Sequence, residues 1–157
     1  MDDLTYDRLM EIIVRSLNHM DDRLTGHGER IAYGMMRLLQ RDPRFSPEEI
    51  CKLIWITLLH DIGNFQGLSI GELLKRELGS PHSHAKYGYL FLKHLGPYPE
   101  YAPIVLYHHS GREEIDASGM GEPLKWVAKC MMALDTLDLY QIGTPSLSKE
   151  QLSELLT

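Results

Sequence analysis

The stretch Leu58-Leu59-His60-Asp61-Ile62-Gly63-Asn64 places a histidine and an aspartate side by side where an apolar helix ends. The preceding apolar positions follow the three- and four-residue spacing of a helix face: Ile50, Leu53, Ile54, Thr57 and Leu58. Neighbouring side chains on a regular helix diverge by about 100°, so this doublet converges on one centre only where the backbone bends. We interpret His60 and Asp61 as the hub of a metal site, in which the two oxygens of Asp61 bridge two ions.

The rest of the chain also has helical character. Apolar periodicity or capping residues predict helices over these ranges: 4–18, 27–41, 47–60, 69–78, 81–95, 101–109, 124–140 and 148–156. Residues 110–122 contain three glycines and no apolar period, so a loop is expected there. We find no strand pair, repeat or linker in the sequence. The prediction is an all-α fold, a compact bundle of about seven or eight helices in one domain over residues 1–157.

Composition restricts the classes of function. The net charge of −6 argues against broad nucleic-acid binding through a basic surface, although bound divalent cations would still allow a small anionic substrate. The sequence has no apolar run of membrane-spanning length and no signal-peptide pattern, so we expect a cytoplasmic protein without a membrane partner. The two cysteines, Cys51 and Cys130, lie in apolar helical stretches and are predicted to be reduced and buried.

A set of seven side chains lies at predicted helix ends or beside apolar helix faces: His27, His60, Asp61, His84, His108, His109 and Asp135. Taken singly, most have an ordinary explanation, such as a core histidine or a surface residue. As a set, their segments are separated by 23 to 33 residues, which is about one helix pair each, so successive helices can bring them to a shared core. Imidazole and carboxylate ligands suit iron, manganese or zinc, and two such ions are a common arrangement for phosphoester hydrolysis.

Five sequence blocks occur in order: 26–32 (GHGERIA), 58–63 (LLHDIG), 84–88 (HAKYG), 108–109 (HH) and 133–138 (ALDTLD). Together they resemble the HD superfamily of metal-dependent phosphohydrolases, and more narrowly its HD-GYP branch, whose members include cyclic di-GMP phosphodiesterases. The likeness runs from about Gly26 to Tyr140.

The resemblance implies two divalent transition metal ions, iron or manganese first, with zinc, nickel or cobalt as alternatives. It assigns one ion to His27, His60, Asp61 and Asp135. Asp61 would bridge to a second ion on His84, His108 and His109.

Two departures from the family pattern bear on catalysis. Asn64 stands where active members have a lysine, so the expected catalytic residues are His60, Asp61 and an uncharged hydrogen-bond donor, Asn64. The loop after His109 lacks the family's tyrosine, and the GYP signature is absent. Lys86 and Arg112 are candidates for holding a substrate phosphate, with solvated surface cations as the equally weighted alternative.

We expect hydrolysis of a nucleotide phosphoester, with cyclic dinucleotides among the candidates. Two alternatives stay open: an HD-fold di-iron oxygenase that oxidises a small molecule, and a non-catalytic signalling or binding module. The expected partners are a small phosphorylated or nucleotide substrate and, among proteins, a second copy of the chain or a signalling protein. Asp138, one helical turn after Asp135, is expected either to orient that side of the site or to make a packing contact. Met35, Tyr87 and Met131 are predicted core residues.

Overall fold

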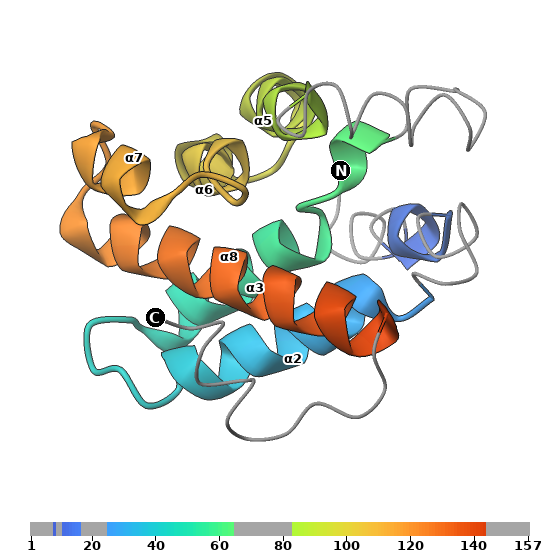
Figure 1. Cartoon of the computed structure of the whole chain (residues 1–157), viewed down its shortest axis with the longest axis horizontal. Coiled ribbons are helices and arrows are strands. Elements are labelled where there is room, and N and C mark those ends of the chain that lie inside the picture. The colour runs from blue at the N-terminus through green and yellow to red at the C-terminus, as the bar shows by residue number, and fades with distance from the viewer. Residues whose placement is uncertain (1–7, 9–10, 17–24, 65–82, 144–157) are drawn as a thin grey trace.

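The computed structural model describes residues 8, 11–16, 25–64 and 83–143 (Figure 1). Its elements are α2 (His27–Leu39), α3 (Pro47–Leu58), η2 (Ile62–Asn64), α5 (Ser83–Leu95), η3 (Pro99–Tyr101), α6 (Ala102–Leu106), α7 (Arg112–Ala117) and α8 (Glu122–Gly143). These described parts of the chain form helices and turns with no strand, so the predicted all-α fold is confirmed. The predicted helices at 69–78 and 148–156 lie outside the described residues.

The long helix α8 organises the packing (Figure 1). It contacts α2, α6 and α7, while α2 also packs along α3. On the other side, α5 packs against α6 and against the short turn η2. The residues at the end of α3 therefore lie where α5 and α6 meet the layer of α2, α3 and α8.

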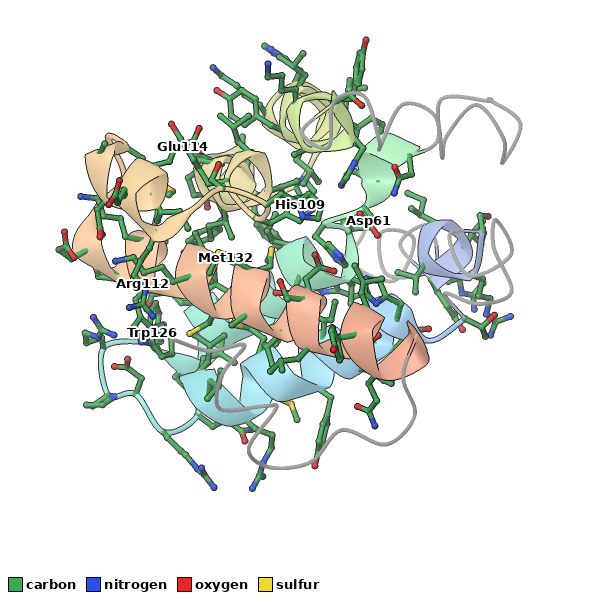
Figure 2. The ribbon with its side chains drawn as sticks, viewed as in Figure 1. Asp61, His109, Arg112, Glu114, Trp126 and Met132 are labelled. Carbon is green, nitrogen blue, oxygen red and sulfur yellow. The ribbon has the colours of Figure 1, made fainter. Side chains whose placement is uncertain are left out.

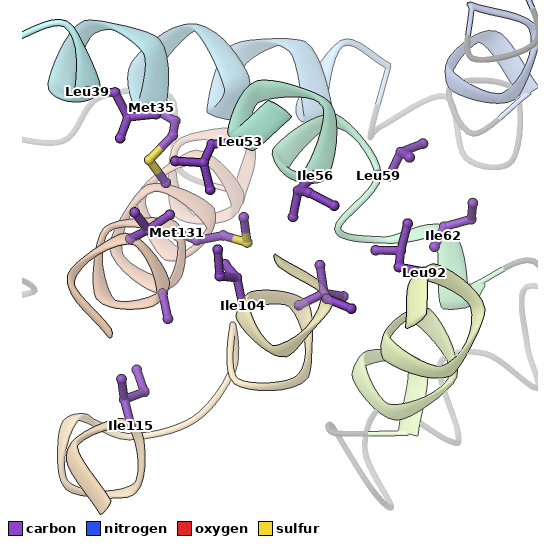
Figure 3. Packing of buried hydrophobic residues seen from close by; sticks show 14 of the residues in the cluster. Met35, Leu39, Leu53, Ile56, Leu59, Ile62, Leu92, Ile104, Ile115 and Met131 are labelled. Atoms are coloured by element: carbon purple, nitrogen blue, oxygen red, sulfur yellow. The ribbon is translucent and has the colours of Figure 1, made fainter. Parts of the chain in front are cut away.

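The hydrophobic core lies between these helices (Figure 3). Each of the longer elements contributes fully buried apolar side chains, among them Met35, Leu39, Leu53, Ile56, Leu92, Ile104, Ile115 and Met131. The predictions for Met35 and Met131 are confirmed. Tyr87 is 48% exposed, so its predicted place in the core is wrong. The small residues Ala85 and Gly88 lie on the buried face of α5, and Tyr87 lies outside that face.

The start of α3 forms as the sequence predicts. The hydroxyl of Ser46 accepts a hydrogen bond from the amide of Glu49, and the Glu49 carboxylate accepts one from the Ser46 amide at 2.9 Å. These reciprocal bonds satisfy backbone donors that the first turn of a helix leaves free. The helix faces the core with Leu53, Ile56 and Thr57.

The prediction of a loop over residues 110–122 is wrong in part, because the short helix α7 forms within this range. Ile115 is fully buried and anchors this helix in the core, but one apolar residue gives no period that sequence analysis could detect. The predicted helix at 101–109 is also shorter, since α6 ends at Leu106 and both histidines of the pair lie in the following turn.

The prediction that both thiols are buried is wrong for Cys51. Cys51 is exposed and Cys130 is half-buried, and both are free. Cys51 lies two residues before Leu53, which is about 200° away around α3 and thus on its outer face.

Candidate metal centre

The backbone tightens immediately after α3, at the His60-Asp61 doublet. The amides of His60, Ile62 and Asn64 bond to carbonyls three residues back, at 3.3, 3.0 and 2.9 Å. This three-residue spacing replaces the regular helix and changes the direction of the side chains. The His60 Nε2 atom consequently lies 3.6 Å from Asp61 Oδ2, so the doublet faces one centre, as the sequence analysis expects.

One group of potential ligand atoms comprises His27, His60 and Asp61, whose atoms lie within 4.8 Å of one another. His27 enters from the first residue of α2. Asp135, on α8, lies beside the group, with Oδ1 at 3.1 Å from His27 Nε2 and 3.8 Å from His60 Nε2. His27, the doublet and Asp135 are each more than 30 residues apart in sequence, and the fold brings them together.

A second group comprises Asp61, His84, His108 and His109, again with ligand atoms within 4.8 Å of one another. Asp61 Oδ1 lies 3.4 Å from His84 Nε2 and 4.0 Å from His108 Nε2. The other oxygen, Oδ2, faces His27 and His60. Asp61 thus belongs to both groups, with one oxygen turned to each.

Hydrogen bonds at Nδ1 fix how three of the imidazoles are oriented. Nδ1 of His60 donates to the Thr57 carbonyl at 2.8 Å, and Nδ1 of His108 donates to the Val105 carbonyl at 2.6 Å. Nδ1 of His27 donates to the Asp138 carboxylate at 2.7 Å. Because these oxygens only accept, each Nδ1 carries a proton, and Nε2 is the ring nitrogen that faces the cluster.

The inward-facing nitrogens lack ordinary partners. The buried Nε2 atoms of His27 and His60 make no hydrogen bond. His84 Nε2 lies 2.7 Å from His109 Nε2 and 3.3 Å from His108 Nε2, so a proton or a cation has to separate these atoms. Burying such polar atoms unpaired is costly, and a divalent cation would pair them. The donor set of imidazoles and carboxylates fits divalent metal binding.

The charges of the cluster reinforce this arrangement. Burial lowers the pKa of His60, but Asp61 and Asp135 outweigh it and raise that pKa to about 9. Burial, together with the neighbouring His60 and His109, lowers the pKa of His108 to about 3. Burial raises the pKa of Asp135, yet contacts with His27 and His60 hold it well below its usual range. Burial also raises the pKa of Asp61, but His60 and His84 outweigh it and lower that pKa. Both carboxylates therefore stay ionised and attract a cation.

Close backbone packing brings His84 to the doublet. A Cβ atom on Gly63 would lie 1.9 Å from the His84 carbonyl oxygen and 2.6 Å from the Gly88 amide nitrogen. Only glycine at position 63 lets η2 approach α5 this closely. The glycine of the doublet motif thus allows Asp61 and His84 to lie close together.

The cluster is not completely buried. Asp61 and His109 keep 21% and 25% of their side-chain surface exposed, whereas His60 and His108 are almost completely buried. Asp61 and His109 are labelled in Figure 2. Asp61 and His109 are thus the most exposed of the proposed ligands.

The structure separates the remaining predicted site residues. Asn64 ends η2 and is half-buried, three residues after Asp61. Lys86 is exposed on α5, two residues after His84. Arg112 is exposed at the start of α7 and lies away from Asp61 and His109 (Figure 2). This placement gives no support to the predicted phosphate-binding role of Arg112.

Sequence analysis named Asp138, the partner of His27, as a residue that could orient the site, but it missed the partners of His60 and His108. The carbonyls of Thr57 and Val105 are backbone groups, which no residue type identifies. Arg30, which binds Asp138, was not singled out, because one cation on an exposed helix face carries no distinct pattern.

The fold and the cluster define an all-α protein with a buried His/Asp centre suited to divalent metal ions. Residues 26–140 match the HD domain, and the chain belongs to this family. The HD domain defines a superfamily of metal-dependent phosphohydrolases, which agrees with the cluster. Searches of curated proteins and of solved structures found no match. Among the described helices, none has the length and apolar character needed to cross a membrane.

Proposed function

We propose that the protein is a phosphohydrolase that uses two divalent metal ions to hydrolyse a small phosphoester. The observation that carries this proposal is the shared residue Asp61, whose two oxygens face two separate groups of ligand atoms. Two ions would supply Lewis-acid chemistry: they activate water near neutral pH and neutralise charge on phosphate oxygens. A nucleotide phosphoester is the proposed substrate class, and a cyclic dinucleotide is the first candidate, in the cytoplasm.

The residues take distinct roles in this proposal. His27, His60 and Asp135 hold one ion, and His84, His108 and His109 hold the other, with Asp61 shared between them. Asn64 would donate a hydrogen bond near the substrate, where the HD-GYP family places a lysine. Lys86 would hold a substrate phosphate, since it follows the proposed metal ligand His84 by two residues.

The second candidate function is oxidation of a small molecule by a di-iron form of the same centre. The observation that favours it is Asn64, which brings no positive charge to the position of the family's lysine. The same ligand set serves both chemistries, so only substrate and oxygen dependence distinguish them.

The first experiment measures metal content by elemental analysis, on protein purified without a metal-affinity tag. We expect about two transition metal ions per chain, with loss in Asp61→Ala. The matched control is His94→Ala, because His94 is an exposed histidine of α5 outside both groups. The loaded protein is then assayed against phosphoesters, including cyclic dinucleotides, with and without oxygen.

The outcomes separate the hypotheses. Phosphoester turnover that disappears in His60→Ala and Asp61→Ala, while both variants stay folded, supports the proposal. Oxygen consumption with a small substrate and no phosphoester turnover favours the di-iron oxygenase. No stoichiometric metal, even after anaerobic reconstitution with iron or manganese, excludes both enzymes and leaves a binding or signalling module.

A further inference from the structure

We infer that Arg30 and Asp138 form a positioning pair that fixes the imidazole of His27 for metal binding. The inference rests on the proposed metal site, because it assigns a role toward the ion that His27 would hold. Arg30 and Asp138 lie outside both groups of potential ligands.

Arg30 holds the Asp138 carboxylate through two parallel hydrogen bonds. Arg30 Nε donates to Oδ1 at 2.6 Å, and Nη2 donates to Oδ2 at 2.8 Å. The third guanidinium nitrogen, Nη1, donates to the Thr25 carbonyl at 2.9 Å. A two-point bond to a planar carboxylate fixes its orientation as well as its position.

The carboxylate in turn fixes the ring of His27. Asp138 Oδ2 lies 2.7 Å from His27 Nδ1, and His27 Nε2 then lies 3.1 Å from Asp135 Oδ1. An ionised carboxylate accepts only, so Asp138 holds a proton on Nδ1 and turns Nε2 toward Asp135, on the side where a cation would bind. A carboxylate behind a metal-binding histidine also makes that imidazole a stronger ligand.

His27 differs from the other imidazoles in this respect. His60 and His108 donate through Nδ1 to backbone carbonyls of their own segments. His27 instead depends on a side chain 111 residues away, on the far helix α8. Asp138 lies one turn beyond Asp135, so the same stretch of α8 supplies a proposed ligand and the support for another.

The sequence before α2 leaves space for the arginine. Gly26 has φ 73°, a left-handed conformation that favours glycine, and the chain enters α2 directly after it. A Cβ atom at position 26 would lie 3.1 Å from Arg30 Nη1. Gly26 therefore accommodates both the turn into α2 and the guanidinium beside it.

The test compares Asp138→Asn and Arg30→Ala with the wild type. We expect the affinity for one of the two ions, measured by chelator competition with Mn²⁺, to fall about 10–100-fold while the other ion is retained. A second readout uses metal-free protein, at a pH where His27 is neutral. Imidazole ¹⁵N–¹H correlation spectra should show one tautomer in the wild type, with the proton on Nδ1, and a mixture in both variants.

Arg30→Lys separates positioning from charge. Lysine keeps the positive charge but offers a point donor in place of the two-point fork, so we expect an intermediate loss of affinity. This variant also provides the test if Asp138→Asn does not fold. The matched control is Asp116→Asn, which breaks an exposed ion pair with Lys129 between α7 and α8 and should change neither readout.

An unchanged His27 tautomer and unchanged affinity for both ions in Asp138→Asn and Arg30→Ala would overturn the inference. Equal loss of both ions would also contradict it, because it would indicate a general structural effect. If the wild type binds no metal, the proposed function fails. The tautomer of His27 in the metal-free protein then still decides whether the pair positions the ring.

Discussion

His60 and His108 show how strongly the surroundings decide the behaviour of one residue type. Both rings are buried and both donate from Nδ1 to a backbone carbonyl. Burial lowers the pKa of each, but Asp61 and Asp135 reverse the effect at His60 and raise its pKa to about 9. Beside His108 the neighbours include two imidazoles, and its pKa falls to about 3. A proton therefore occupies His60 in the metal-free protein and has to leave before a cation binds.

This competition predicts the pH dependence of metal binding. With a pKa of about 9, His60 is protonated at pH 7, so a cation that binds its Nε2 atom displaces that proton. The apparent affinity should rise with pH up to about 9 and then level off. Titration calorimetry with Mn²⁺ under anaerobic conditions, in buffers of different ionisation enthalpy, measures the number of protons released when the ion binds. We expect at least one proton at pH 7 and a smaller number at pH 9.

His60→Gln provides the comparison, since glutamine has no proton to lose in this pH range. The number of protons that this variant releases on binding Mn²⁺ at pH 7 should be smaller by about one. Binding without proton release in the wild type at pH 7 would contradict the assigned charge of His60.

At the scale of elements, the predictable helices are those with a long apolar period or explicit caps. The helices α2, α3 and α8 have such signals, and all three form near their predicted ranges. The helix α7 depends on one buried side chain, Ile115, and it gave no periodic signal. The helix α6 ends at Leu106, and in the turn that follows His108 bonds through Nδ1 to the Val105 carbonyl. Residue types and spacing identified the clustered side chains. The backbone partners are carbonyls three residues back, which no residue type marks, and the contact between Arg30 and Asp138 depends on tertiary packing.

The contact between η2 and α5 predicts the effect of Gly63→Ala. The added Cβ would lie 1.9 Å from the His84 carbonyl oxygen, well under the 3.0 Å below which neighbouring atoms have to move. The helix α5 would have to shift, and His84 would move away from Asp61. We expect a destabilisation of about 1–3 kcal/mol by urea unfolding and loss of the ion held by the second group.

Gly111→Ala is the matched control for this substitution. Gly111 precedes α7 with φ −63°, and a Cβ atom there meets nothing within 4 Å. Its unfolding free energy should stay within about 0.5 kcal/mol of the wild type, with metal content unchanged. Equal behaviour of the two variants would refute the role assigned to the close contact at Gly63.

At the scale of the whole molecule, the cluster joins segments that are distant in sequence. Its side chains come from the start of α2, the turn after α3, the start of α5, the turn after α6 and the middle of α8. Without a cation, the unpaired Nε2 atoms of His27 and His60 oppose folding. A metal ion in each group would bind the native arrangement alone, because the unfolded chain does not bring the ligands together.

Metal removal should therefore lower the stability of the whole described bundle. An ion present at 100 times its dissociation constant stabilises the native state by about 2.7 kcal/mol. For a protein of this size, that free energy corresponds to roughly 5–10 °C in Tm. Differential scanning calorimetry with Mn²⁺ and after chelation measures this difference in Tm.

The variant Asp61→Ala should lose most of the increase in Tm that Mn²⁺ gives, since Asp61 belongs to both groups, and His94→Ala should keep it. An increment of equal size in Asp61→Ala would mean that the ions bind elsewhere.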